Sequence, residues 1–289
     1  GIKVVINSVT GQTGGMGAYF QAGDIPSVNF NILDRNNNPI SSSQIASVRF
    51  VFSGPTEGHN YQKIIPSGNS TTLTITLPAS SFGPWTYNST QAVPTTCPAQ
   101  PNDSTDYTYA NGSGELKGLP LAAGTYTLCV YAYRNVTVPP TTQPVYRETS
   151  EPALANVRVG SAGTAVAYQD IVNDAKCNAC HGDLAFHGNG RKSVQECILC
   201  HTAGAEGNSS STDPVLQTVD FKVMIHKIHA GRGLDAVANG ATSAWENAWL
   251  PSMRPEGPRN CKACHADNSN AWNTPIENTD VRIWKVACT

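Results

Sequence analysis

One five-residue pattern occurs three times in this chain of 289 residues: a cysteine, two variable residues, a second cysteine and a histidine. The copies are "CNACH", "CILCH" and "CKACH", at residues 177–181, 197–201 and 261–265. In this pattern the two thiols add to the two vinyl groups of a haem, and the histidine becomes the proximal ligand of the iron. The sequence therefore predicts three haems c, attached through Cys177, Cys180, Cys197, Cys200, Cys261 and Cys264 and ligated by His181, His201 and His265.

Two other kinds of cysteine site explain less of the pattern. A zinc ribbon could use Cys177 and Cys180 together with Cys197 and Cys200, but zinc has no need of a histidine after each pair. A thioredoxin-like redox site uses a single Cys-x-x-Cys where a strand meets a helix. The repeated histidine favours haem over both.

The second axial ligand of each haem decides what the iron can do. A haem with histidine on both sides only passes electrons, whereas an open sixth position can bind a small molecule. Three further histidines lie in the same half of the chain: His187, His226 and His229. The last two belong to "VDFKVMIHKIHAGRG", a predicted short helix whose i, i+3 spacing puts both imidazoles on one face.

His187 follows His181 too closely to cross easily over the same haem, so we expect it to ligate another. Methionine is the other usual sixth ligand and raises the potential, but only Met224 and Met253 are available here. We expect Met224 to pack within its helix. Three bis-histidine haems of low potential are the prediction, with His187, His226 and His229 as distal ligands.

Residues 1–162 have a different character. Short segments rich in β-branched and aromatic residues, among them "KVVINSVT", "PSVNFNILD", "IASVRFVFSG" and "GTYTLCVYAYR", are separated by turn residues. They predict an antiparallel β-sandwich or split barrel. Residues 163–289 carry six of the seven histidines and four of the five tryptophans. There we predict a loop-rich multihaem domain with short helices, whose core is the haem faces and Trp245, Trp249, Trp272 and Trp284.

No catalytic constellation is present in the first half, where His59 is interpreted as a polar loop residue. Covalent haem attachment takes place outside the cytoplasmic membrane, so the protein is exported. In an oxidising compartment a Cys97–Cys129 disulfide would stabilise the domain by roughly 3 kcal/mol, and we expect it in preference to two unpaired thiols. The alternative for Cys129 is a small buried apolar residue.

Composition excludes two classes of function. The formal net charge of −2 offers no basic surface for phosphates, so nucleic acid is not an expected partner. No apolar run is long enough to span a bilayer as a helix. The opening "GIKVVINSVT" has neither a signal-peptide core nor a lipidation cysteine, so we expect any such signal to have lain upstream.

The segments "CNACHGDLAFHG", "CILCHTAG", "VDFKVMIHKIHAG" and "RNCKACH", in that order after a β-rich domain containing "PSVNFNILDRNNNPI", resemble the outer-membrane decahaem cytochromes of metal-reducing bacteria, the OmcA/MtrC family. The resemblance implies a chain of closely spaced bis-histidine haems. It also implies a protein that is exported through the periplasm and is either held at the extracellular face of the outer membrane or secreted. It implies electron transfer to metal oxides, flavins or partner cytochromes, with His187, His226 and His229 matching distal ligands. Terminal metal reduction at an exposed haem is possible in such a protein, but we expect electron transfer rather than true enzyme catalysis.

The chain is shorter than family members, and Cys288 with Thr289 looks like the start of a fourth motif. We therefore expect an N-terminal portion of a longer protein. Two alternatives stay open. One is a multihaem reductase of a small oxyanion with one open haem, which often has lysine in place of the proximal histidine. The other is a subunit of a conductive filament, with His59 ligating a haem across a subunit contact.

Overall fold

The computed structural model describes residues 1–16, 18–57, 61–102, 108–109, 112–113, 116–137, 146–206, 219–230 and 260–269. Its strands are β1 (Ile2–Thr10), β2 (Ser27–Asp34), β3 (Ser47–Gly54), β4 (Gln62–Ile65), β5 (Leu73–Ile75), β6 (Trp85–Asn88), β7 (Thr108–Tyr109), β8 (Gly112–Ser113), β9 (Gly124–Val136), β10 (Tyr146–Thr149) and β11 (Ala153–Val159). Its helices are α1 (Asp174–His181), α2 (Val194–Ile198) and α4 (Phe221–Ala230), with 3-10 turns η1 (Ser42–Gln44) and η6 (Cys261–Ala263).

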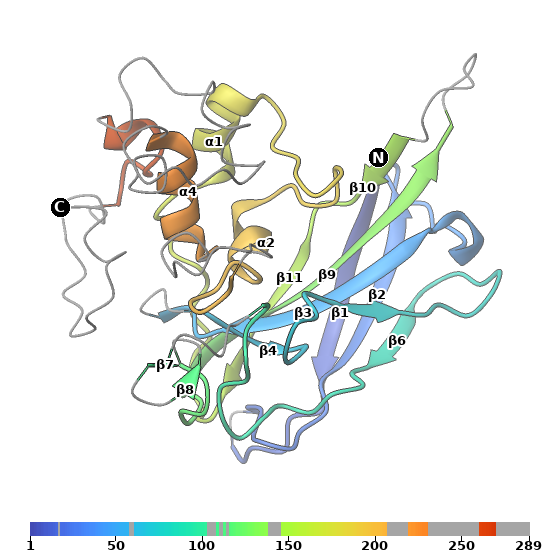
Figure 1. The fold of residues 1–289 in the computed structure, drawn as a ribbon. Coiled ribbons are helices and arrows are strands. Elements are labelled where there is room, and N and C mark those ends of the chain that lie inside the picture. The colour runs from blue at the N-terminus through green and yellow to red at the C-terminus, as the bar shows by residue number, and fades with distance from the viewer. Residues whose placement is uncertain are drawn as a thin grey trace.

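The strands form two antiparallel sheets and a small hairpin. The first sheet, here sheet A, has the order β1-β2-β6. The second, sheet B, has the order β10-β9-β3-β4, with β11 also pairing with β9 and β5 also pairing with β3. The helices lie together on one side of the strands (Figure 1). The predicted fold class, antiparallel sheets followed by a region of short helices and loops, is confirmed.

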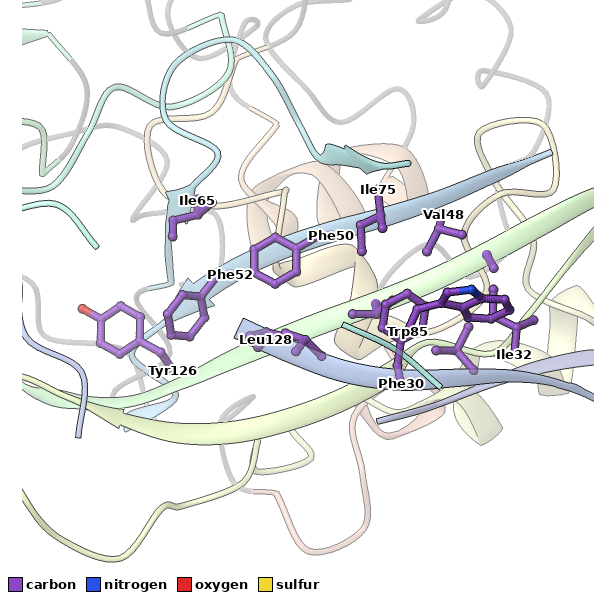
Figure 2. Packing of buried hydrophobic residues seen from close by; sticks show 14 of the residues in the cluster. Phe30, Ile32, Val48, Phe50, Phe52, Ile65, Ile75, Trp85, Tyr126 and Leu128 are labelled. Atoms are coloured by element: carbon purple, nitrogen blue, oxygen red, sulfur yellow. The ribbon is translucent and has the colours of Figure 1, made fainter. Parts of the chain in front are cut away.

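The core between the two sheets follows from the alternation of side chains along each strand. Phe50 and Phe52 of β3 point inward, as does Leu128 of β9, and each is fully buried. Aromatic rings meet edge to face, with 5.8 Å between the centroids of Phe20 and Phe52 and 5.9 Å between those of Phe52 and Tyr126. Figure 2 shows Phe50, Phe52, Tyr126 and Leu128 among the packed side chains of this core.

Sheet B is covered on its other face as well. Val51 of β3 and Cys129 and Tyr131 of β9 point away from sheet A into a second apolar cluster. The helical part of the chain supplies the other side of this cluster, through Leu184, Val194, Ile198 and Leu199. The first nine residues of β9 are all buried, as expected of a strand covered on both faces. The helical part of the chain therefore packs directly on sheet B.

The predicted disulfide between Cys97 and Cys129 is not formed, and both cysteines are buried free thiols. Cys129 lies in the outer cluster of sheet B, with Val51 and Leu199. Cys97 is buried too but belongs to neither apolar cluster, and its N–H donates to the carbonyl of Leu119 at 2.8 Å. The two thiols form no bond with each other. Cys129 is the small buried apolar residue of the alternative interpretation.

The segment that follows the last strand is fastened to the sandwich. The backbone N–H of Val166 donates to the hydroxyl of Thr125 at 2.8 Å, and the hydroxyl of Thr56 donates to the carbonyl of Val166 at 2.7 Å. Nearby, Arg158 pairs with Glu57 at 2.8 Å. These contacts fix where the chain leaves the β-half. Within the described part of the chain, no helix is long and apolar enough to cross a membrane.

Several residues singled out in the sequence lie outside the described residues. These are His59, Trp245, Trp249, Met253, Trp272, Trp284 and Cys288.

Candidate haem-binding region

The three motifs each sit on a short helical turn. The first closes α1, which begins where the side chain of Asn173 accepts a hydrogen bond from the backbone N–H of Lys176. The second begins in α2, which Ser193 caps in the same way. The third starts on η6. Helical spacing at i, i+3 and i+4 brings the two thiols and the histidine of each motif to neighbouring positions.

The second and third motifs share a specific backbone contact. The N–H of His201 donates to the carbonyl of Cys197 at 2.9 Å, and the N–H of His265 donates to the carbonyl of Cys261, also at 2.9 Å. The histidine is thus tied to the first cysteine of its own motif. A single haem can bind the two cysteines and the histidine of one motif only if the five-residue segment is compact. The hydrogen bond between the histidine and the first cysteine keeps the second and third motifs compact.

Each motif histidine faces one of the three other histidines. The ring centroids lie 6.1 Å apart for His181 and His229, 5.9 Å for His187 and His201, and 6.2 Å for His226 and His265. His187 therefore lies beside the histidine of the second motif rather than that of its own segment. α4 supplies one partner to the first motif and one to the third, from positions three residues apart on the same helix.

These distances fit a haem iron between the two rings of each pair. Two iron–nitrogen bonds of about 2 Å, with about 1.1 Å from each nitrogen to its ring centre, give about 6.2 Å between centroids. All three pairs lie within a few tenths of an ångström of this value. The residues present therefore fit bis-histidine ligation.

The outer nitrogens of three rings are held by backbone carbonyls. Nδ1 of His201 lies 2.9 Å from the carbonyl of Val219, and Nδ1 of His229 lies 2.8 Å from that of Ile225. Nδ1 of His226 contacts the carbonyl of Lys222 at 2.5 Å. A carbonyl can only accept, so it keeps the proton on Nδ1 and leaves the lone pair on Nε2. That tautomer is the one that can ligate a metal through Nε2.

A zinc-ribbon arrangement is not formed by these cysteines. Among the residues that the structure describes, no three or more His, Cys, Asp or Glu side chains gather as the ligands of one metal ion would. The described histidines instead lie in three pairs, with 5.9–6.2 Å between the ring centroids of each pair.

Comparisons with known proteins find a family match and a similar solved structure. Residues 169–287 match the family model of outer membrane cytochrome MtrC/MtrF-like, domains II/IV. This part of the chain is similar to domains II/IV of the MtrC/MtrF-like outer-membrane cytochromes. Among solved structures, MtrC from Shewanella baltica OS185 aligns with 91% of this chain and 43% of its own, at 19% identity and a TM-score of 0.45. The chain thus spans less than half the length of that structure. The search of curated proteins found no match to this chain.

In this MtrC/MtrF-like part, the second motif is held by the β-sandwich through buried hydrogen bonds. The hydroxyl of Ser53 donates to the carbonyl of Leu199 at 2.5 Å, and the side-chain amide of Gln62 donates to the carbonyl of Ala203 at 3.1 Å. Gln100 accepts a hydrogen bond from the hydroxyl of Thr202 at 2.7 Å. The backbone on either side of His201 is therefore fixed by residues far away in the sequence.

The partner histidine of this pair is held by the sandwich too. His187 lies in a loop with left-handed backbone at three successive residues, His187, Gly188 and Asn189, with φ of 53°, 66° and 60°. Arg147 stacks on Tyr133 of β9, 4.4 Å from the ring centroid, and donates to the carbonyl of His187 at 3.4 Å. Both members of the His187–His201 pair thus rest on sheet B.

Burial favours the neutral form of His201, His187 and His265. It lowers the pKa of His201 to about 4, assisted by the nearby His187 and Arg191. The side chain of His187 reaches the surface, yet packing removes part of its water shell and, together with Arg191, lowers its pKa. Burial and His226 lower the pKa of His265. Neutral imidazole is the form that binds a metal.

Sequence reasoning identified all six paired histidines but missed the residues that hold the second motif, Ser53, Gln62 and Gln100. The residue type of a serine or glutamine in the β-half does not by itself indicate a hydrogen bond to a distant motif. The sequence did carry a sign that the outer face of sheet B is covered. Val51, Cys129 and Tyr131 are apolar or aromatic and occupy the outward positions of their strands.

Proposed function

We propose that the chain is a multihaem c-type cytochrome that conducts electrons between three covalently bound bis-histidine haems. The observation that carries this proposal is the facing of each motif histidine by a second histidine at the centroid spacing of a bis-histidine haem. The family match over residues 169–287 supports it. When bound, each haem cycles between ferric and ferrous iron and so carries one electron.

The residues have separate roles in this proposal. The thiols of Cys177, Cys180, Cys197, Cys200, Cys261 and Cys264 attach the haems and keep them in place in both redox states. His181, His201 and His265 are the proximal ligands, and His229, His187 and His226 are the respective distal ligands. Because the second imidazole fills the sixth position, water and small substrates are kept from the iron. Hydrogen bonds from Nδ1 to backbone carbonyls hold the orientation of His201, His226 and His229.

Further parts of the proposal concern the setting of this conduit. We propose that residues 1–162 form the sandwich domain and residues 163–289 the multihaem domain. The acceptors would be metal oxides, flavins or partner cytochromes, met at an exposed haem on the extracellular face of the outer membrane. The match of residues 169–287 to an outer-membrane cytochrome family supports this location. Other multihaem cytochromes and outer-membrane conduit proteins are the corresponding partners.

The oxyanion reductase needs one iron with an open position. Each of the three motif histidines faces a second imidazole, which argues against such a position at these three haems. The filament model relied on His59, which lies outside the described residues.

The test is to remove the distal histidines one at a time, as His187→Ala, His226→Ala and His229→Ala, in protein carrying its haems. Carbon monoxide binds ferrous haem only where a position is open. Each variant is expected to shift about a third of the Soret absorbance on addition of carbon monoxide, and the unmodified protein none. The matched control is His59→Ala, which removes the one histidine of the first half and is expected to shift none.

Two results would contradict the assignment. One is a distal variant that stays insensitive to carbon monoxide, which would mean that another group ligates that iron. The other is a shift in the unmodified protein, which would mean that one haem is open and would revive the reductase. A shift on His59→Ala would instead favour a ligand contributed from the first half.

A further inference from the structure

One exposed aromatic side chain contacts the histidine of a haem-binding motif. The ring centroid of Phe186 lies 6.0 Å from that of His181, and the two ring planes make an angle of 69°. Phe186 is 39% exposed. A single exposed phenylalanine is ordinary on a protein surface, but a ring that packs edge to face against an imidazole restricts how that imidazole can turn. The contact therefore limits the rotation of His181.

The backbone around Phe186 is fixed on both sides. Its N–H donates to the carbonyl of Arg191 at 2.9 Å, and the N–H of Arg191 donates back at 3.1 Å. Arg191 in turn stacks on Tyr131 of β9, 4.2 Å from the ring centroid. Two residues before Phe186, the N–H of Leu184 donates to the side-chain oxygen of Asn178 in α1 at 2.7 Å. The phenylalanine is therefore presented to the motif histidine by a loop that both sheet B and α1 hold.

The first histidine pair differs from the other two in the angle between its rings. The planes of His181 and His229 are 88° apart, whereas those of the other two pairs are 25° and 41° apart. Within the described part of the chain, the aromatic contacts of His201 and His265 are those with their histidine partners. His181 has Phe186 in addition. The nearly perpendicular pair is thus the one whose motif histidine packs against a further ring.

The orientation of His229 has a separate cause. Its Nδ1 lies 2.8 Å from the carbonyl of Ile225 in α4, which holds the plane of this imidazole relative to the helix. The angle of 88° therefore depends on what holds the plane of His181. Turning His181 about its Cβ–Cγ bond would either break the edge-to-face contact with Phe186 or drive the two rings together.

We propose that Phe186 is a positioning residue that holds the imidazole plane of His181 nearly perpendicular to that of His229. This inference rests on the proposed bis-histidine haem at this pair. The planes of the two axial imidazoles decide which iron orbital holds the unpaired electron of a low-spin ferric haem. Phe186 would thereby set the electronic structure of one haem of the conduit without ligating its iron.

The test is electron paramagnetic resonance of the oxidised full chain with its haems attached. Phe186→Ala removes the ring but keeps the backbone hydrogen bonds with Arg191. We expect this variant to lose the strongly anisotropic low-spin signal that perpendicular planes give, and to show instead a signal whose largest g-value is lower. The signals of the other two pairs should stay in place. Phe186→Tyr keeps the ring and should retain the spectrum of the unmodified protein. The matched control is Phe82→Ala, which removes a phenylalanine that is 60% exposed just before β6 and should leave every signal unchanged.

The proposal is overturned if Phe186→Ala leaves the strongly anisotropic signal in place, or if Phe186→Tyr loses it as well. A change confined to the other two signals would also refute it, because Phe186 would then support the loop of His187 rather than the plane of His181. If Phe186→Ala does not retain its haems, Phe186→Leu fills a similar volume without a flat ring and should show the same loss. Carbon monoxide binding to the unmodified protein, which does not depend on Phe186, marks failure of the proposed function instead.

Discussion

Gln100 joins the sandwich to the second haem-binding motif, and its replacement by leucine tests that junction. The residue is 1% exposed and makes four hydrogen bonds. Its oxygen accepts from the N–H of Lys63 at 3.1 Å and from the hydroxyl of Thr202 at 2.7 Å. Its amide donates to the carbonyls of Lys63 at 3.2 Å and Pro98 at 2.9 Å. Leucine fills a similar volume and makes none of these bonds.

The magnitude follows from the groups that Gln100→Leu leaves without a partner. A buried donor or acceptor that loses its hydrogen bond costs about 1–3 kcal/mol. Two buried donors, the N–H of Lys63 and the hydroxyl of Thr202, lose their acceptor, which costs about 2–6 kcal/mol of folding free energy. Burial of the apolar leucine side chain offsets part of this cost. We expect Gln100→Leu to lower the free energy of unfolding by about 2–4 kcal/mol.

The assay is denaturant unfolding of the haem-loaded protein in a double-mutant cycle with Thr202→Val. Thr202→Val removes the hydroxyl that Gln100 binds, so the double variant should cost about 1 kcal/mol less than the sum of the single variants. Gln44→Leu, at an exposed position on η1, is the matched control and should change stability by less than about 0.5 kcal/mol. An additive cycle, or a Gln100→Leu effect no larger than the control, would refute the reasoning.

Three further perturbations have outcomes fixed by the structure. Phe52→Ala removes a fully buried ring from the sandwich core and should cost about 3–5 kcal/mol in chemical denaturation. Glu196 has its folded pKa raised to about 7 from an ordinary value of 4.5, so folding favours its protonated form and stability falls as pH rises from about 5 to about 8. Glu196→Gln should flatten that fall, and an unchanged slope would exclude Glu196 as its source. Replacing Cys197 and Cys200 together by alanine should remove one haem from the intact mass and leave two.

Much of the fold could be predicted because its signals are local. The segments "KVVINSVT", "PSVNFNILD", "IASVRFVFSG" and "GTYTLCVYAYR" coincide with β1, β2, β3 and β9. The helix expected in "VDFKVMIHKIHAGRG" is α4, and the carboxylate of Asp220 accepts from the N–H of Lys222 at its start. Both periodicity and capping act within a few residues, so a sequence carries them directly.

The short strands β4, β6 and β10 were not predicted. Each has four residues and depends on pairing with a longer neighbour. In β4 all four residues are buried, Lys63 among them, so its composition does not alternate. Such strands are decided by tertiary contacts rather than by their own propensity.

The pairing of histidines could not be predicted for a similar reason. Residue type and supply indicated that six imidazoles serve three irons, but His181 meets His229 and His265 meets His226 only after α4 has packed between the motifs. The incorrect disulfide has the same origin. Two cysteines in one half of a chain form a bond only if the fold brings their side chains together, and Cys129 packs instead in the outer cluster with Val194 and Ile198 of α2.

The most direct test of the central claim, three bis-histidine haems with the pairings seen here, is the electron paramagnetic resonance spectrum of the fully oxidised protein. The planes of His187 and His201 are 25° apart, those of His226 and His265 41°, and those of His181 and His229 88°. Nearly parallel imidazole planes give a rhombic low-spin signal, and perpendicular planes give a strongly anisotropic one. The account predicts three low-spin ferric haems per chain, with both signal types present. A high-spin ferric signal, or fewer than three low-spin centres, would contradict it.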